Sequence, residues 1–110
     1  MHHKPLKPAV CHILLALGEG QVHGLGIADW VEEYTRGAVE LGPGTLYRTL
    51  KEMLELELVR ETPAAESDAD PRRKYYAITA EGRRRMVSEV ARLERLVKTA
   101  RDRNFVPRRA

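Results

Sequence analysis

Apolar residues recur along much of the chain at the spacing of one face of a helix. Within residues 42–54, Leu46, Leu50, Met53 and Leu54 follow an i, i+4, i+7, i+8 pattern, which predicts a short helix with one buried face. A proline near the helix start costs no hydrogen bond, because the first N–H groups of a helix have no intrahelical partner. The opposite face carries small, hydroxyl and cationic residues, namely Gly44, Thr45, Arg48 and Lys51.

This predicted helix has the surface that a helix needs in order to enter the DNA major groove. Such a helix is thin at its tip, polar outward and rigidly packed behind. The same pattern also fits an ordinary amphipathic helix with a solvated polar face, and this stretch alone favours neither interpretation. The segments before and after it have to decide between them.

Two helices are predicted upstream. The first starts at Pro8, is apolar on most sides and ends at Gly18, which indicates burial in the core or against a partner chain. The second is expected over residues 25–35, with acidic residues facing water. Its buried stripe is expected to contain Ile27, Trp30, Val31 and Tyr34. This second helix and the groove-suited helix, joined by a short linker, make a helix-turn-helix.

Downstream of residue 54 the pattern becomes that of strands. Residues 56–62 and 75–79 are rich in strand formers and flank a polar loop over residues 63–71 that contains two prolines. They predict a β-hairpin, which directly after a helix-turn-helix forms a wing. The base of the wing holds Arg72, Arg73 and Lys74, which could contact the DNA backbone or minor groove. The acidic residues expected at its tip, which would repel phosphate, are Glu66, Asp68 and Asp70.

A long C-terminal helix is expected after Thr79, whose side chain can cap its start. Its apolar residues alternate by four and three positions, as in a coiled-coil seam: Met86, Val90, Leu93, Val97 and Ala100, with Leu96 beside them. We expect this seam to pair with a second copy in a two-fold dimer. The alternative is packing against the chain's own first helix. The predicted organisation is therefore a winged helix-turn-helix over residues 1–79, a dimerisation helix over residues 80–104 and a tail over residues 105–110.

Composition narrows the class of protein. The chain has 110 residues, 43% of them hydrophobic and 32% charged, which indicates one globular domain and not a disordered chain. The helix and strand patterns above make this domain mainly α with a small β-hairpin. It shows no apolar run of membrane-spanning length and no signal peptide, so we expect a cytoplasmic protein that does not bind a membrane. The net charge of +3 is uneven. Residues 1–71 hold 6 basic and 12 acidic side chains, whereas residues 72–110 hold 13 and 4, which suggests a polyanionic partner for the second part.

Candidate chemistry for catalysis is missing from the sequence. The single cysteine, Cys11, excludes an intramolecular disulfide and a cysteine-based zinc site, and the four histidines share no metal-ligand spacing. No nucleophile–base pair, paired carboxylates or phosphate loop is apparent. We therefore expect neither an enzyme nor a bound cofactor or metal. Trp30 is expected in the core, with lining of a cavity near a dimer interface as the alternative.

The motifs together resemble the PadR family of bacterial transcriptional regulators over about residues 8–100. The residues that carry the resemblance are Gly44-Thr45-Leu46-Tyr47, Leu50, Leu54, Leu58-Val59, Arg73, Tyr75-Tyr76, Ile78-Thr79 and Gly82. The resemblance implies a winged-helix dimer that binds pseudo-palindromic operator DNA, usually as a repressor. It also implies that the C-terminal helix makes the dimer together with the N-terminal helix. The chain is similar to short members, which have one helix after the wing, whereas longer relatives carry a larger C-terminal domain.

Two positions depart from the family pattern. Arg48 stands where the family usually has proline, which adds a cation to the outward face for a phosphate or a guanine edge. Glu57 stands where a glycine usually ends this helix; with a positive φ it would cost on the order of 1 kcal/mol or more. The ring of Tyr47, at the border of the buried face, is expected to pack. Its hydroxyl either reaches a phosphate or serves no contact to DNA.

Two hypotheses about partners follow. The first is a homodimer that binds double-stranded DNA, with a possible small-molecule effector acting at the dimer interface. The second is a winged-helix protein–protein interaction module without specific DNA binding, which the acidic residues 1–71 and the acidic wing tip would suit.

Overall fold

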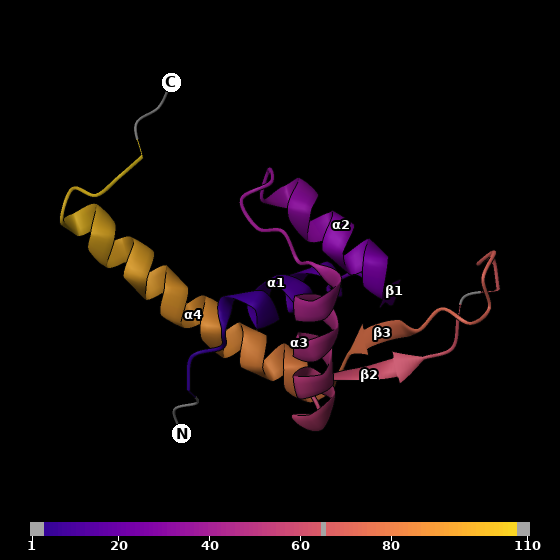
Figure 1. The fold of residues 1–110 in the computed structure, drawn as a ribbon. Coiled ribbons are helices and arrows are strands. Elements are labelled where there is room, and N and C mark those ends of the chain that lie inside the picture. Colours follow the sequence, from indigo (N-terminus) through magenta and orange to yellow (C-terminus); the bar gives the residue numbers. More distant parts are fainter. Residues whose placement is uncertain (1–3, 65, 108–110) are drawn as a thin grey trace.

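The computed structural model describes residues 4–64 and 66–107, and within them it shows a winged helix followed by a long helix (Figure 1). The elements, in chain order, are α1 (Pro8–Ala16), β1 (Val22–His23), α2 (Gly24–Tyr34), α3 (Pro43–Glu55), β2 (Val59–Thr62), β3 (Tyr75–Ile78) and α4 (Ala80–Asp102). This confirms the mainly α fold with a small sheet. None of the helices in the described ranges is long and apolar enough to cross a membrane.

The wing belongs to a three-stranded antiparallel sheet with the order β1-β3-β2. In the predicted hairpin, Val59 pairs with Ile78 and Thr62 with Tyr75. The sequence did not predict β1, which pairs His23 with Tyr75 across the other side of β3. A two-residue strand leaves no periodic pattern in a sequence. This short strand is important for the arrangement of the elements, because β1 joins the start of α2 to the base of the wing.

The core lies where α1, α2 and α3 meet the sheet. Its largest fully buried side chains are Ile13, Leu14, Leu17, Ile27, Val31, Leu46, Leu50, Met53 and Leu58. The expectation that Trp30 and Tyr34 belong to the buried stripe of α2 is wrong, since they are 41% and 43% exposed. Ile27 and Val31 already form the inward row of α2. Trp30 and Tyr34 form the next i, i+4 row, which points away from the core, and their rings stack with centroids 4.8 Å apart.

The exit from α3 is a turn with a left-handed residue. Glu57 has a φ of 59°, and the backbone N–H of Leu58 donates to the carbonyl of Met53 over 2.9 Å. The N–H of Glu57 donates to the carbonyl of Leu54, which completes a Schellman motif. Glu57 therefore forms the turn that a glycine would normally form, and its left-handed backbone conformation is strained.

The start of α4 packs closely on this exit turn. The Thr79 hydroxyl accepts a hydrogen bond from the N–H of Gly82 at 2.9 Å, which confirms the predicted cap. A Cβ atom at Gly82 would lie 2.1 Å from the carbonyl oxygen of Leu58, so only glycine allows this approach. The first turns of α4 are thereby fixed relative to α3.

The two halves of α4 have different surroundings. Its first half packs on α1 and the N-terminal segment, where the backbone N–H of Leu6 donates to Glu89 at 3.1 Å and Met86 packs against the core. Its second half projects away from the other helices (Figure 1). There the predicted seam is uncovered within the described chain, with Leu93 38% and Leu96 57% exposed.

Candidate nucleic-acid interface

The outward face of α3 is the first part of the candidate interface. Gly44, Thr45, Arg48 and Lys51 are all exposed, at the spacing of one helical stripe. Behind them Leu46, Leu50 and Met53 are buried, and the Thr49 hydroxyl donates to the carbonyl of Thr45 over 2.7 Å. In the described parts of the chain, neither Arg48 nor Lys51 has an ion-pair partner. The stripe therefore presents a hydroxyl and two uncompensated cations on a rigid support.

Tyr47 lies beside this stripe and reaches back to α2. A Cβ atom at Gly24 would lie 2.5 Å from the Tyr47 hydroxyl oxygen and 2.9 Å from the nearest ring carbon. The glycine therefore lets the aromatic ring lie directly over the first turn of α2. The expected packing of the ring is seen, although Tyr47 stays nearly half exposed.

A cleft of about 250 Å³ lies between α3, the start of α2 and the base of the wing. It is lined by His23, Gly24, Leu25, Tyr47, Arg72, Arg73 and Lys74. The structure thus brings together Tyr47 and the three wing cations, which the sequence predicted only as separate groups. The first N–H groups of α2 have no intrahelical partner and form the positive end of the helix dipole. A helix start, a phenol hydroxyl and cations are groups that bind a phosphate oxygen.

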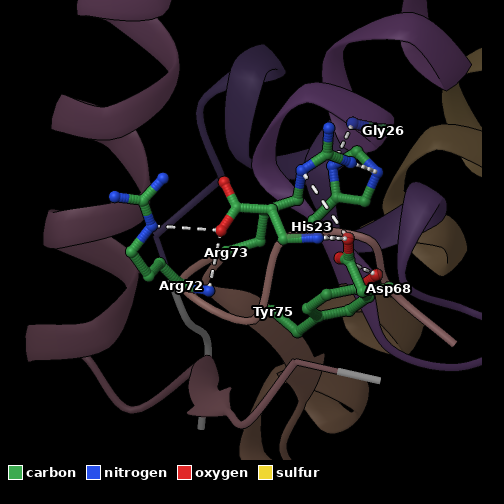
Figure 2. A network of polar contacts seen from close by, with 7 residues as sticks. His23, Gly26, Asp68, Arg72, Arg73 and Tyr75 are labelled. Carbon is green, nitrogen blue, oxygen red and sulfur yellow. Dashed lines mark hydrogen bonds and ion pairs between the residues drawn. The ribbon is translucent and has the colours of Figure 1, made fainter. Parts of the chain in front are cut away.

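His23 links the cleft to the wing through the polar network in Figure 2. Its Nδ1 accepts a hydrogen bond from the N–H of Gly26 at 3.0 Å and so caps α2. Its Nε2 lies 3.3 Å from the Arg73 guanidinium, and its ring meets the edge of Tyr75 with centroids 5.5 Å apart. Sequence reasoning missed His23, because its link to the wing depends on Arg73, fifty positions away.

Asp68 is the centre of the same network. Its side chain is only 4% exposed, accepts from the Tyr75 hydroxyl at 2.6 Å and from the N–H of Asp70 at 2.9 Å, and lies 3.9 Å from the Arg73 Nε. The Tyr75 hydrogen bond, the backbone hydrogen bond and the nearby Arg73 together hold the pKa of Asp68 below its usual value. The same bond to Asp68 raises the pKa of Tyr75.

The expectation of an exposed acidic wing tip is therefore wrong for Asp68. The Asp68 carboxylate folds back onto the basic end of the wing. Asp70 accepts from the backbone N–H and the Nε of Arg72, two residues further on, at 2.9 and 3.2 Å, and its side chain stays 41% exposed. Backbone N–H groups and arginines attract these carboxylates more strongly than water does when several act together. Glu66 remains exposed in the loop.

The three wing cations differ in how freely they can move. Arg73 is held between His23 and Asp68, whereas the Arg72 side chain is 89% exposed and the Lys74 ammonium lies 3.8 Å from Glu61 at the surface. Exposed ion pairs contribute little, so Arg72 and Lys74 can exchange their carboxylate for another anion. Arg73 is better suited to holding the wing against α2.

The fold and this surface define a class of protein. The chain is a winged-helix protein in which the second helix of the helix-turn-helix, α3, presents a polar, cationic face beside a cleft lined by cations. The model of the transcriptional regulator PadR-like family matches residues 13–88, which is well over half of the chain. The chain belongs to this family of transcriptional regulators. Because the family consists of regulators and not of enzymes, the expectation that the chain is not an enzyme is also confirmed.

Solved structures agree with this assignment. A PadR family transcription regulator from Clostridium difficile R20291 is 25% identical, with a TM-score of 0.74 over 87% of this chain and 97% of that chain. A PadR-like transcriptional regulator from Bacillus cereus is 23% identical, with a TM-score of 0.74 over 90% and 92% of the two chains. Among curated proteins, none matches this chain in sequence.

A further solved structure is Bacillus subtilis PadR in complex with operator DNA. It is 17% identical, with a TM-score of 0.67 over 80% of this chain, and the match covers 49% of that longer chain. At this identity the likeness shows the shared fold.

Proposed function

We propose that this PadR-like regulator is a dimeric, sequence-specific DNA-binding repressor that acts in the cytoplasm on a pseudo-palindromic operator. The observation that carries the proposal is the continuity between the exposed polar stripe of α3 and the cation-lined cleft at the start of α2. Together they offer base-reading and phosphate-binding groups on one surface. Operator DNA in the complex of the structurally similar Bacillus subtilis PadR supports the same assignment here.

In this proposal α3 enters the major groove. Thr45, Arg48 and Lys51 face the base edges, and Gly44 lets the backbone approach closely because nothing surrounds the position of its missing side chain. A guanidinium can donate two hydrogen bonds to guanine O6 and N7, so Arg48 is the leading candidate for base recognition. Arg48 lies on the outward face of α3, and the buried Leu46 and Leu50 on the opposite face hold the helix in place. This rigid support suits Arg48 to discriminate between DNA sequences.

A phosphate of the bound DNA would occupy the cleft. The Tyr47 hydroxyl and N–H groups of the first turn of α2 that His23 does not cap would donate to it. Arg72 and Lys74 would release their surface carboxylates to reach it. Arg73 would position the wing through His23 and Asp68. Each phosphate contact releases a counterion, so affinity should fall steeply as the salt concentration rises.

The uncovered seam of α4 is the proposed dimer interface. The seam comprises Met86, Val90, Leu93, Leu96, Val97 and Ala100. Its four members from Val90 to Val97 are exposed in the described chain, whereas Met86 packs against the core and Ala100 is half-buried. Covering such a surface contributes about 25 cal/mol per Å² of apolar area, which favours pairing with a second copy. A two-fold dimer presents two α3 helices to half-sites about one DNA turn apart. In this organisation residues 1–79 bind DNA, residues 80–104 dimerise and residues 105–110 form a tail.

Repression follows most simply from this arrangement, since a dimer that covers an operator excludes other proteins from it. A small-molecule effector, where one exists, would act at the dimer interface by changing the spacing of the two α3 helices. The rival function is a protein–protein interaction module that keeps the fold without specific DNA binding. A monomer that binds no DNA specifically would favour that rival.

The proposal is tested by a gel shift with the DNA upstream of the chain's own coding region. We expect specific binding that resists competitor DNA and a mass in solution of two chains. Arg48→Ala should lower specific affinity by about 1–3 kcal/mol, as expected for a base contact. Arg95→Ala is the matched control, because it removes an equal charge from the exposed side of α4. Binding that competitor DNA of any sequence abolishes equally would contradict the proposal.

A further inference from the structure

An exposed aromatic surface joins α1 to α2. Trp30 and Tyr34 stack with an interplanar angle of 29°, and the Tyr34 hydroxyl lies 2.5 Å from the Nδ1 of His12 on α1. Leu15 lies one helical turn further along α1 and is also exposed. We call these four residues, His12, Leu15, Trp30 and Tyr34, the aromatic patch. Stacking and the hydrogen bond order its side chains, yet nothing within the described chain covers it.

A second uncovered apolar group lies directly after α4. Phe105 is 77% exposed, and Val106 beside it is also exposed. The backbone that carries Phe105 is nevertheless fixed. Asn104 has a φ of 68°, the N–H of Phe105 donates to the carbonyl of Ala100 at 2.8 Å, and the N–H of Asn104 donates to that of Arg101 at 3.0 Å.

These two hydrogen bonds form a Schellman motif, in which the residue in the position of Phe105 normally packs against the residue in the position of Ala100. An alanine is too small to cover a phenyl ring. The motif therefore fixes the backbone at Phe105 while its large apolar side chain lies in solvent. This is the geometry of an anchor that fills a site on another surface.

The charges around the two surfaces are complementary. Asp29 and Glu33 flank Trp30 and Tyr34 on the outer side of α2, and both are exposed without an ion-pair partner in the residues described. Two arginines lie beside Phe105 in the chain, Arg101 and Arg103. Both are exposed and, among the described residues, have no ion-pair partner. Guanidinium groups also pack favourably on aromatic faces. The acidic aromatic patch is thus complementary to a basic segment that carries one phenyl ring.

We propose that residues 101–106 of one copy dock on the aromatic patch of the second copy, with Phe105 as the anchor. The inference rests on the proposed dimer. The chain's own patch is out of reach, because the continuous helix α4 carries its C-terminal end away from α1 and α2 (Figure 1). An antiparallel crossing of two α4 helices places the second half of one beside the first half of the other. That first half packs on α1, which shares the aromatic patch with α2.

Trp30 is the sole tryptophan, so its fluorescence reports on the patch directly. In the full-length dimer we expect blue-shifted emission and weak quenching by acrylamide. Phe105→Ala should shift the emission to longer wavelength and increase quenching, at a concentration where the measured mass still shows two chains. Leu56→Ala is the matched control, since Leu56 is an exposed apolar residue on the exit turn of α3 and should leave both readings unchanged.

A reporter on the other side of the contact gives a second, independent reading. In the double variant Trp30→Phe, Phe105→Trp, the new indole should be protected from acrylamide in the dimer and become accessible on dilution to monomer. A dimer in which Phe105→Ala leaves the emission of Trp30 unchanged would overturn the docking proposal and leave the α4 dimer intact. A monomeric wild-type chain would overturn both. Protection of Trp30 only after adding a small aromatic compound would assign the patch to that ligand and overturn docking of the partner.

Discussion

Replacing Glu57 by glycine is expected to stabilise the protein. Glu57 holds the left-handed position of the turn that ends α3, with a φ of 59°. Its backbone has fixed duties, because its N–H donates to the carbonyl of Leu54 and its carbonyl accepts from the Thr79 hydroxyl at 2.5 Å. Its side chain forms no hydrogen bond or ion pair in the described structure and is exposed. The substitution therefore removes strain and little else.

The size of the effect follows from two opposing contributions. A side chain in the left-handed region costs about 1–2 kcal/mol. Glycine removes this cost but adds backbone freedom to the unfolded chain, which costs about 0.4–1 kcal/mol. With values near the middle of both ranges, the net gain in the free energy of unfolding should be about 0.5–1 kcal/mol. For a chain of this length that corresponds to a rise in the unfolding midpoint of about 2–6 °C.

Thermal or urea unfolding, compared at one protein concentration because a dimer is expected, measures this difference. Glu55→Gly is the matched control. It changes the same residue type two positions earlier, where the backbone is helical, and should destabilise by up to about 1 kcal/mol. If both glycine variants unfold more easily than the wild type, the left-handed strain at Glu57 is refuted.

Three further substitutions test the contacts around the wing and α4. Gly82→Ala should cost several kcal/mol of unfolding free energy or prevent folding, since its Cβ would meet a backbone oxygen at 2.1 Å. Unfolding curves measure this loss, and Gly44→Ala is the control because the space around Gly44 is open. His23→Ala should cost about 1 kcal/mol of unfolding free energy by removing the cap of α2, and His23→Asn should restore most of it. Asp68→Asn should lower stability near neutral pH. The folded pKa of Asp68 is depressed, so its contribution to stability is present above the ordinary carboxyl pKa of about 4 and is lost as pH falls through the folded value. The stabilities of the two proteins should therefore converge on acidification.

The helices were predictable because their apolar residues repeat with the helical period and their ends carry strong local signals. Pro8 and Pro43 start α1 and α3, and Thr79 caps α4 as the sequence indicates. Periodicity fails where two rows of apolar residues compete. In α2, both the row of Ile27 and the row of Trp30 have helical spacing, and only the packing of α1 and α3 against α2 selects the first for burial.

The candidate site was predictable only in its local parts. The outward stripe of α3 follows from its sequence, since helix geometry alone separates Arg48 from Leu50. The cleft depends on β1, which brings His23 and Gly24 beside residues 72–74. Likewise, the inward fold of Asp68 depends on Tyr75 and Arg73 lying at hydrogen-bonding distance across the loop. No local pattern encodes such long-range contacts, so the sequence alone predicts an exposed acidic tip.

Selection of binding sites from random double-stranded DNA tests the central claim most directly. A dimer that reads sequence through α3 predicts enrichment of a two-fold symmetric site, with half-site centres about one helical turn apart. It also predicts that Arg48→Ala relaxes the preference at one position of each half-site, with little change elsewhere. Recovery of unselected DNA, or of an asymmetric site that the Arg48 variant prefers equally, would contradict the account.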